Sequence, residues 1–240
     1  MLSDIDIVLI NTSHPGNIGA AARAMKTMGF KQLVLVAPRY FPHTEAEALA
    51  ASAVDVLQQA RIVSNLDEAL KGITTVIGTS ARLRDLAAPL LTARECGTWL
   101  IHNRVGRTAI LFGEERTGLT NEALDRCHAY VHINTADEYS SLNLAQAVQI
   151  IAYELRLALL SMPKTENNPG EVLLSDDTAM EGYFQHLERL MVAIEFLDPQ
   201  FPKRLMPRLR RLYHRARPEV QELNILRGIL TAVEKKIGNE

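Results

Sequence analysis

The stretch INTADEYSSLNLAQAVQIIAYELRLALL, Ile133 to Leu160, contains the strongest structural signal in the chain. Leu144, Val148 and Ile151 follow one another at intervals of four and three residues, and the apolar pattern continues to the end of the stretch, as on one buried face of a helix. A short apolar strand, Tyr130 to Ile133, precedes this helix, and a polar loop joins the two. Strand, polar loop and helix in this order form the layout of a binding site.

The beginning of this helix carries more polar groups than a cap requires. Ser140, Ser141 and Asn143 can each accept a hydrogen bond from the free amides of a first helical turn, and one acceptor is enough. One interpretation is a well-capped core helix. The other is that the surplus hydroxyl and amide groups face a ligand.

Composition limits the class of protein. With 240 residues, 47% hydrophobic and 22% charged, the chain is typical of a globular protein with one domain and an appendage. A net charge of −2 neither favours nor excludes a nucleic-acid partner. Cys96 and Cys127 lie too far apart to indicate a zinc site or a disulfide framework, so a reducing cytoplasm fits best. We expect no metal.

Neither the N-terminus nor the longest apolar region of the chain indicates a membrane segment. The N-terminus, MLSDIDIVLIN, carries acidic residues where a signal peptide would be positively charged. The longest apolar region, Leu142 to Leu160, is interrupted by Gln146, Glu154 and Arg156, and these polar and charged side chains are unfavourable at the centre of a bilayer. We therefore expect a soluble, unprocessed cytoplasmic protein.

Short apolar runs alternate with helical segments through the first 160 residues, which predicts an α/β domain with five or six mostly parallel strands. The expected strands are Ile5 to Ile10, Leu33 to Ala37, Val76 to Gly78, Thr108 to Phe112 and Tyr130 to Ile133. The expected helices are Ile18 to Met28, Glu45 to Gln59 with a break near Ser52, Asp67 to Lys71, Arg94 to His102, one headed by Thr120, and Leu144 to Leu160. Ligands bind beyond the carboxyl ends of such strands, where four polar loops would meet. These loops are Asn11 to Asn17, Thr79 to Arg84, Gly113 to Gly118 and Asn134 to Asn143.

A change of composition divides the chain after the long helix. Residues 162–175, MPKTENNPGEVLLS, read as a linker, so we expect a domain at 1–161 and a helical extension at 176–240. Its expected helices are Thr178 to Phe196, Lys203 to Arg215 and Pro218 to Ile237. The segment Lys203 to Arg217 is basic and contains no acid. It is either a solvated face or a phosphate-binding surface.

The first loop does not support a nucleotide cofactor. Its sequence HPGNIGAA lacks the third glycine of a dinucleotide fingerprint, and no phosphate-binding P-loop occurs in the chain. The second strand ends in Ala37, Pro38 and Arg39, with no acid to hold a ribose. The GNIG segment follows a strand instead of joining two helices, which argues against a KH domain.

Three segments, taken together, resemble the SPOUT, or α/β-knot, RNA methyltransferases. Motif 1 is NTSHPGNIGAAARAMKTMGF (Asn11 to Phe30), motif 2 is ILFGEERTGLTNEAL (Ile110 to Leu124) and motif 3 is INTADEYSSLNLAQAVQI (Ile133 to Ile150). Their order and spacing match the ribose 2′-O branch. Within it, the chain is similar to the bacterial tRNA (cytidine/uridine-2′-O-)methyltransferases, closely over residues 1–160 and more loosely over the helical tail.

The resemblance implies a parallel sheet with a deep trefoil knot, although knots are rare in proteins. It also implies a homodimer that binds S-adenosylmethionine in the knot and methylates a cytidine or uridine at position 32 of the tRNA anticodon loop. The implied cofactor contacts are Thr79, Ser80, Ala81, Gly113, Ile133, Ser140, Ser141 and Leu142. The implied RNA contacts are Arg82, Arg84, Arg208, Arg210 and Arg211.

The implied catalytic residues are Arg23, Asn11, Ser141, Asn143 and Glu115. An arginine does not readily lose its proton, so we expect Arg23 to hold the target phosphate and to stabilise alkoxide character. The alternative for Arg23 is an ordinary surface salt bridge. We expect Glu115 to shape its loop or to hold Arg23 across the dimer rather than to act as a base, and Asn143 to orient the loop or the ribose.

Some residues of these motifs allow other interpretations. Gly113 and Gly118 would also suit tight turns without any ligand. His14 has a pKa near neutrality, but beside Pro15 it fits a turn or an RNA contact better than catalysis. Glu114 stands where some relatives carry a basic residue. From another class of protein, the strongest alternative is a catalytically inert, dimeric RNA-binding protein of the same fold.

Overall fold

The computed structural model describes residues 2–80, 88–103, 105–136, 138, 141–161 and 173–237. Four of the expected site residues, Ala81, Arg82, Arg84 and Ser140, therefore lie outside the described residues.

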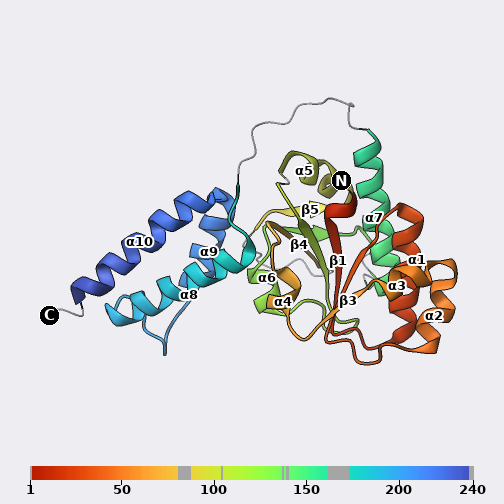
Figure 1. The fold of residues 1–240 in the computed structure, drawn as a ribbon, viewed down its shortest axis with the longest axis horizontal. Coiled ribbons are helices and arrows are strands. Elements are labelled where there is room, and N and C mark those ends of the chain that lie inside the picture. Colours follow the sequence, from red (N-terminus) through yellow and green to blue (C-terminus); the bar gives the residue numbers. More distant parts are fainter. Residues whose placement is uncertain are drawn as a thin grey trace.

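A seven-stranded parallel sheet forms the centre of the protein, with strand order β3-β2-β1-β6-β4-β7-β5 (Figure 1). The strands are β1 (Ile5–Ile10), β2 (Gln32–Val36), β3 (Arg61–Val63), β4 (Thr75–Thr79), β5 (Leu90–Thr92), β6 (Thr108–Phe112) and β7 (Ala129–His132). The predicted α/β class and parallel pairing are confirmed. β3 and β5 were not predicted, because three residues are too few to show a period.

Helices cover both faces of the sheet. One face packs against α1 (Pro15–Met28), α2 (Thr44–Ala50), α3 (Val54–Gln58), α5 (Ala93–Asn103) and α7 (Leu144–Leu160). The other face packs against α4 (Leu66–Leu70) and α6 (Asn121–Asp125). Strand β1 contributes to both cores, since Ile7 and Leu9 face the first group of helices and Val8 faces the second. This double burial explains why β1 is apolar except at Asp6, whose buried carboxylate forms an ion pair with Arg107 at 2.9 Å.

Local signals set the helix boundaries. His14 caps α1 through Nδ1, which accepts from the Gly16 amide, and Pro15 occupies the first helical position. Gly29 ends α1 in the left-handed conformation, at φ 86°. The predicted break near Ser52 is confirmed, since a short 3-10 helix, Ala51–Ala53, separates α2 from α3.

The C-terminal extension has a core of its own. It consists of α8 (Asp177–Ala193), α9 (Leu205–Ala216) and α10 (Val220–Ile237), which enclose Tyr183, Phe184 and Leu223. In Figure 1 these helices lie to one side of the sheet. The part of the expected linker that is described is ordered, because Leu174 bridges Glu219 and the Ser175 amide donates to the Pro218 carbonyl.

Polar contacts join the extension to the amino-terminal ends of β4 and β7. The Asp177 amide donates to the Ile73 carbonyl at 2.8 Å, and Arg217 donates to the Thr75 hydroxyl at 2.8 Å. Arg126, at the end of α6, forms a buried ion pair with Asp177. The extension thus docks at the edge of the sheet opposite to the carboxyl ends of these strands. No helix within the described ranges is long and apolar enough to cross a membrane.

Candidate active site

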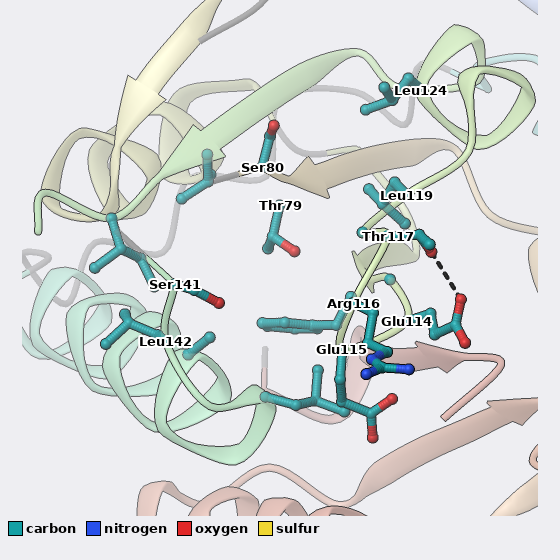
Figure 2. Close-up of a pocket in the computed structure, with 17 residues that line it drawn as sticks. Thr79, Ser80, Glu114, Glu115, Arg116, Thr117, Leu119, Leu124, Ser141 and Leu142 are labelled. Atoms are coloured by element: carbon teal, nitrogen blue, oxygen red, sulfur yellow. Dashed lines mark hydrogen bonds between the residues drawn. The ribbon is translucent and has the colours of Figure 1, made fainter. Parts of the chain in front are cut away.

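A cavity of about 340 Å³ opens at the carboxyl ends of β4, β6 and β7 (Figure 2). Three chain segments far apart in the sequence form most of its wall: residues 79–80, 112–119 and 141–147. Figure 2 shows Ser141 and Leu142 across the cavity from the 114–117 turn, with Thr79 and Ser80 above them. The position agrees with the rule that parallel sheets bind ligands beyond the carboxyl ends of their strands.

Six of the expected cofactor contacts line this one cavity. They are Thr79, Ser80, Gly113, Ile133, Ser141 and Leu142. Hydrogen bonds fix the strand ends that carry the first two, because Thr79 Oγ1 donates to the Leu111 carbonyl at 2.8 Å and the Ser80 amide donates to the Val131 carbonyl at 2.9 Å.

The motif 2 turn is folded back on itself. The Gly118 amide donates to the Glu114 carbonyl at 2.8 Å, and the Glu114 carboxylate accepts from the Thr117 hydroxyl at 2.7 Å. A Cβ on Gly113 would lie 2.1 Å from the Gly118 carbonyl carbon, and Gly118 itself has φ 73°. Both glycines are therefore required by the backbone of a wall of the cavity.

Glu115 connects motif 2 to motif 1. Its carboxylate accepts hydrogen bonds from the Ser13 amide (3.1 Å) and hydroxyl (3.0 Å), the His14 amide (3.3 Å) and the Asn17 side-chain amide (2.8 Å). Partial burial raises the pKa of Glu115, but the hydrogen bonds from Asn17 and Ser13 outweigh it and leave the pKa below its ordinary value. An ionised, fully engaged carboxylate shapes the loop and is poorly suited to act as a base.

Asn143 joins the third motif to the same network. Its Oδ1 caps α7 by accepting from the Ala145 amide at 2.9 Å, while its Nδ2 donates to Asn17 Oδ1 at 2.8 Å. Asn17 thus lies between Glu115 and Asn143, and the three motifs meet through it.

Arg23 and Asn11 do not line the cavity of their own chain. Arg23 is exposed on the third turn of α1, and Asn11 is exposed in the left-handed conformation after β1, at φ 53°. No described carboxylate forms a salt bridge with Arg23, so the surface salt bridge considered above is not observed in this part of the chain. His14 is the α1 cap, in agreement with a role in the turn.

The expected RNA contacts of the extension have different surroundings. Arg208 and Arg211 are exposed on α9. Arg210 points inward, where it pairs with Glu181 at 2.7 and 2.8 Å and lies 4.5 Å above the Phe184 ring centroid. Arg210 therefore holds α9 on α8, and its guanidinium group is not one of the RNA contacts that we propose.

Sequence reasoning missed several residues of the site. Asn17 was part of the first loop but received no role, and its position three residues after the α1 cap gave no sign of its contact with motif 2. Arg116 and the apolar wall were missed as well, because the packing of distant segments decides which residues face the cavity. The apolar wall contains Phe112, Leu119, Leu124, Val131 and Leu144.

The described residues contain no group of three or more His, Cys, Asp or Glu side chains that could hold a metal ion. Cys96 and Cys127 are both free and buried.

The sequence and the structure both match known methyltransferases. Residues 4–153 match the model of the SpoU rRNA Methylase family, and the chain belongs to this family. Residues 178–240 match a second model, the tRNA methyltransferase TrmJ C-terminal domain.

Several relatives that match along nearly the whole chain are TrmJ proteins. The tRNA (cytidine/uridine/adenosine-2′-O-)-methyltransferase TrmJ of Pseudomonas aeruginosa is 51% identical, over 98% of this chain and 95% of its own. The tRNA (cytidine/uridine-2′-O-)-methyltransferase TrmJ of Klebsiella pneumoniae is 50% identical, over 98% of both chains. Among solved structures, TrmJ from Z. mobilis superposes with a TM-score of 0.83 at 32% identity, covering 95% of this chain and 98% of that one.

Proposed function

We propose that this protein transfers a methyl group from S-adenosylmethionine to the ribose 2′-hydroxyl of a cytidine or uridine in tRNA. Its family uses this cofactor, and its full-length relatives are tRNA 2′-O-methyltransferases at about 50% identity. The observation that carries the proposal is that motifs 2 and 3 line one cavity and that motif 1 joins both of them beside it through Asn17. We place the target at position 32 of the anticodon loop and the enzyme in the cytoplasm, where tRNA is found.

The residues of the cavity fit S-adenosylmethionine. Leu119, Ile133 and Leu142 offer an apolar slot for adenine, while the hydroxyls of Thr79 and Ser141 and the backbone of the motif 2 turn offer polar partners. When bound, the cofactor supplies an electrophilic methyl group on a sulfonium. The tight turn at Gly113 lets backbone groups approach the ligand. S-adenosylmethionine carries no phosphate, so a phosphate cradle is unnecessary.

We propose that Arg23 acts on the cofactor cavity of a partner subunit. It is absent from the wall of its own cavity and is exposed on α1, which packs beside α7. A guanidinium remains protonated near neutral pH, so Arg23 would bind the target phosphate and stabilise the developing alkoxide. Glu115 and Asn143 would hold the 11–17 loop in position, and Ser141 would contact the cofactor and the ribose.

The dimer has a candidate interface beside these residues. Tyr153, Leu157 and Leu160 are exposed on α7, at intervals of four and three residues that place them on one face of the helix. We propose that this face and α1 pair with their copies about a two-fold axis. We also propose that motif 3 is threaded through a loop of the same domain to form the trefoil knot.

The extension would bind tRNA. Arg208, Arg211 and Arg215 are exposed on α9 and, among the described residues, form no salt bridge with a carboxylate. Each phosphate contact would release counterions and contribute to a salt-dependent affinity. The division into a domain at 1–161 and an extension at 176–240 remains part of this proposal, as do the contacts of Arg82 and Arg84.

The activity is tested with purified protein, S-adenosylmethionine and unmodified tRNA, followed by nuclease digestion and mass spectrometry of the nucleosides. We expect 2′-O-methylcytidine or 2′-O-methyluridine, and 2′-O-methyladenosine is followed as well, because the Pseudomonas relative is also named for adenosine. Base-methylated products would contradict the proposal.

The methylation assay, combined with calorimetry, distinguishes an enzyme from a catalytically inert RNA-binding protein. Arg23→Ala should abolish turnover and leave the calorimetric affinity for S-adenosylmethionine within about twofold, because the lost contact is made with the substrate and the transition state. Ser141→Leu should instead weaken cofactor binding while the fold persists. If the unmodified protein binds tRNA but no cofactor, the inert alternative holds.

A further inference from the structure

The loop that joins α8 to α9 exposes two aromatic rings. Phe196 is 67% exposed and Phe201 is 71% exposed, whereas Leu197 between them is buried in the extension. Residues 194–204, here called the phenylalanine loop, lie at the lower left of Figure 1, at the far end of α8 from the sheet. A single exposed apolar residue is ordinary, but two largely exposed aromatic rings in one loop favour a surface that binds a ligand or partner.

The phenylalanine loop has a defined backbone. The Phe196 amide donates to the Met191 carbonyl at 2.9 Å, and the Phe201 amide donates to the Asp198 carbonyl at 3.1 Å. The Asp198 carboxylate also accepts from the Gln200 amide at 2.8 Å. Glu195 and Lys203 adopt the left-handed conformation, at φ 59° and 49°, which is uncommon for residues other than glycine. The rings are therefore presented by a formed turn on either side of Leu197.

The exposed cations of α9 continue from this loop. Arg208, Arg211 and Arg215 recur at intervals of three and four residues, so they lie along one face of the helix. None of them pairs with a carboxylate of the described residues, in contrast to Arg210, which is turned inward onto Glu181 and Phe184. Along the chain, two exposed rings are thus followed directly by a helix whose exposed guanidinium groups pair with no described carboxylate, so residues 194–215 offer both aromatic and cationic groups to a ligand.

We propose that the phenylalanine loop stacks unpaired bases of the RNA substrate while the α9 arginines hold the adjoining phosphates. Every base offers a π-face to an aromatic ring, and unpaired bases can be splayed onto such rings, whereas bases in a duplex are already stacked. The charge of α9 selects a polyanion as the ligand. This inference rests on the proposed function for the identity of the substrate and adds that its single-stranded part reaches the extension.

Another exposed apolar surface on the extension provides a matched control. Ile225 and Ile229 are exposed one turn apart on α10, a helix with a single arginine, Arg227, instead of a row of arginines. Ile225→Ala therefore removes a comparably exposed apolar side chain from the same three-helix unit. It should leave RNA affinity unchanged if stacking, and not general hydrophobicity, binds the RNA.

The first test uses full-length protein with Phe196→Ala and Phe201→Ala, alone and combined. Each change should weaken binding of tRNA and of a short unpaired oligoribonucleotide by about fivefold or more, the lower end of measured base stacking on aromatic side chains. Binding of a fully paired RNA hairpin stem should not change. Phe→Tyr at either position should retain affinity because the ring is kept.

The salt dependence of binding distinguishes the contribution of the phenylalanine loop from that of the α9 arginines. The phenylalanine variants should keep the slope of log affinity against log salt, while Arg208→Gln with Arg211→Gln should flatten it, because only the arginines would displace counterions from phosphates. If the alanine variants bind all RNAs normally, or lose the duplex stem equally, stacking is excluded. If they change sedimentation without RNA instead, the loop is a protein contact.

A fluorescence experiment reports on the ring directly. Trp99 is the single tryptophan in the chain, so Trp99→Phe with Phe201→Trp places the only indole in the loop. Stacking on a base should quench its emission when the unpaired oligoribonucleotide is added. Absence of quenching at saturating RNA would overturn the inference, while methylation of tRNA by the same protein would still support the proposed function.

Discussion

The carboxylate of Glu115 accepts four hydrogen bonds, three from the loop that follows β1 and one from Asn17 in the first turn of α1, and these bonds keep it ionised. Its pKa lies below the ordinary value of 4.5, since the hydrogen bonds outweigh the effect of burial. The carboxylate therefore stabilises the fold fully above pH 4.5, and this contribution is lost as the pH falls through the lower pKa of the folded state.

Glu115→Gln should lower the free energy of unfolding at pH 7 by about 1.5–3 kcal/mol, because a neutral amide replaces the charged acceptor and one of its hydrogen-bond positions becomes a donor. Denaturant titration at pH 7 measures the loss. The difference from the unmodified protein should shrink toward pH 3. A difference that grows as the pH falls would contradict the assignment of Glu115 as a structural anion.

Gly113→Ala should disrupt the cofactor cavity, because the new Cβ would meet backbone atoms that cannot move aside independently. We expect at least about a tenfold loss of S-adenosylmethionine affinity by calorimetry, corresponding to about 1.4 kcal/mol. Gly228→Ala is the control at an exposed helical glycine, since a Cβ there would meet no atom within 4 Å and the residue does not have a positive φ. Normal cofactor binding by Gly113→Ala would remove the motif 2 turn from the site.

For individual residues, the sequence indicated which residue types would lie at the site, but not which role each of them would have. Thr79, Gly113 and Ser141 could be placed at one site because they follow strands or precede a helix. The contact of Asn17 with Glu115 spans 98 residues of sequence, and no local pattern encodes it. Arg208 and Arg210 are two residues apart in one basic run, yet only the partners Glu181 and Phe184 turn Arg210 inward.

At the scale of elements, two histidines lie where α9 meets the start of β7. His214 Nδ1 and His128 Nε2 are 3.3 Å apart. Burial, followed by the charges of Arg210 and Arg126, lowers the pKa of His214 from 6.5 to about 4. Burial also lowers the pKa of His128, well below 6.5. Both rings are therefore neutral in the docked extension near neutral pH.

The docked extension should lose stability as the medium becomes acidic. The unfolded state takes up a proton near pH 6.5 and the folded state only near pH 4, so His214 alone should cost about 2 kcal/mol between pH 7 and 5. Hydrogen exchange of α9 as a function of pH measures this loss. His214→Gln should reduce the pH dependence to the part that His128 contributes, and His102→Gln, at an exposed position, should leave it unchanged.

The helices and strands themselves were largely predictable. α7 was expected within the stretch Ile133 to Leu160, with its cap left open among Ser140, Ser141 and Asn143, because its apolar residues keep the helical period. The docking of the extension was not expected, since the ion pair of Arg126 with Asp177 joins residues 51 positions apart. In the sequence, nothing distinguishes the residues of such a buried ion pair from charged residues on the surface.

For the whole molecule, a mixed dimer tests whether two subunits share each site. The Arg23→Ala chain keeps an intact cavity, and the Ser141→Leu chain keeps an intact Arg23. If Arg23 acts in the partner's cavity, a random mixture should regain about a quarter of the unmodified activity, because half of the dimers are mixed and each has one complete site.

The mixture is refolded together from denaturant so that subunits exchange, and tRNA methylation is measured beside each variant alone. Sedimentation checks that dimers have formed. If the mixture is no more active than the sum of its two components, each chain uses its own Arg23. A fully active monomer would contradict the dimer altogether.

The extension holds the sheet by the amino-terminal ends of β4 and β7, while the cavity lies at their carboxyl ends. Substitutions on the outer surface of α9 and in its neighbouring loop therefore have no direct contact with the methyl-transfer machinery. Evolution can therefore change which RNA the extension binds without changing the residues that carry out methyl transfer. An enzyme engineer can do the same by exchanging residues 173–237 between relatives, provided that Arg126, Thr75 and His128 keep their partners.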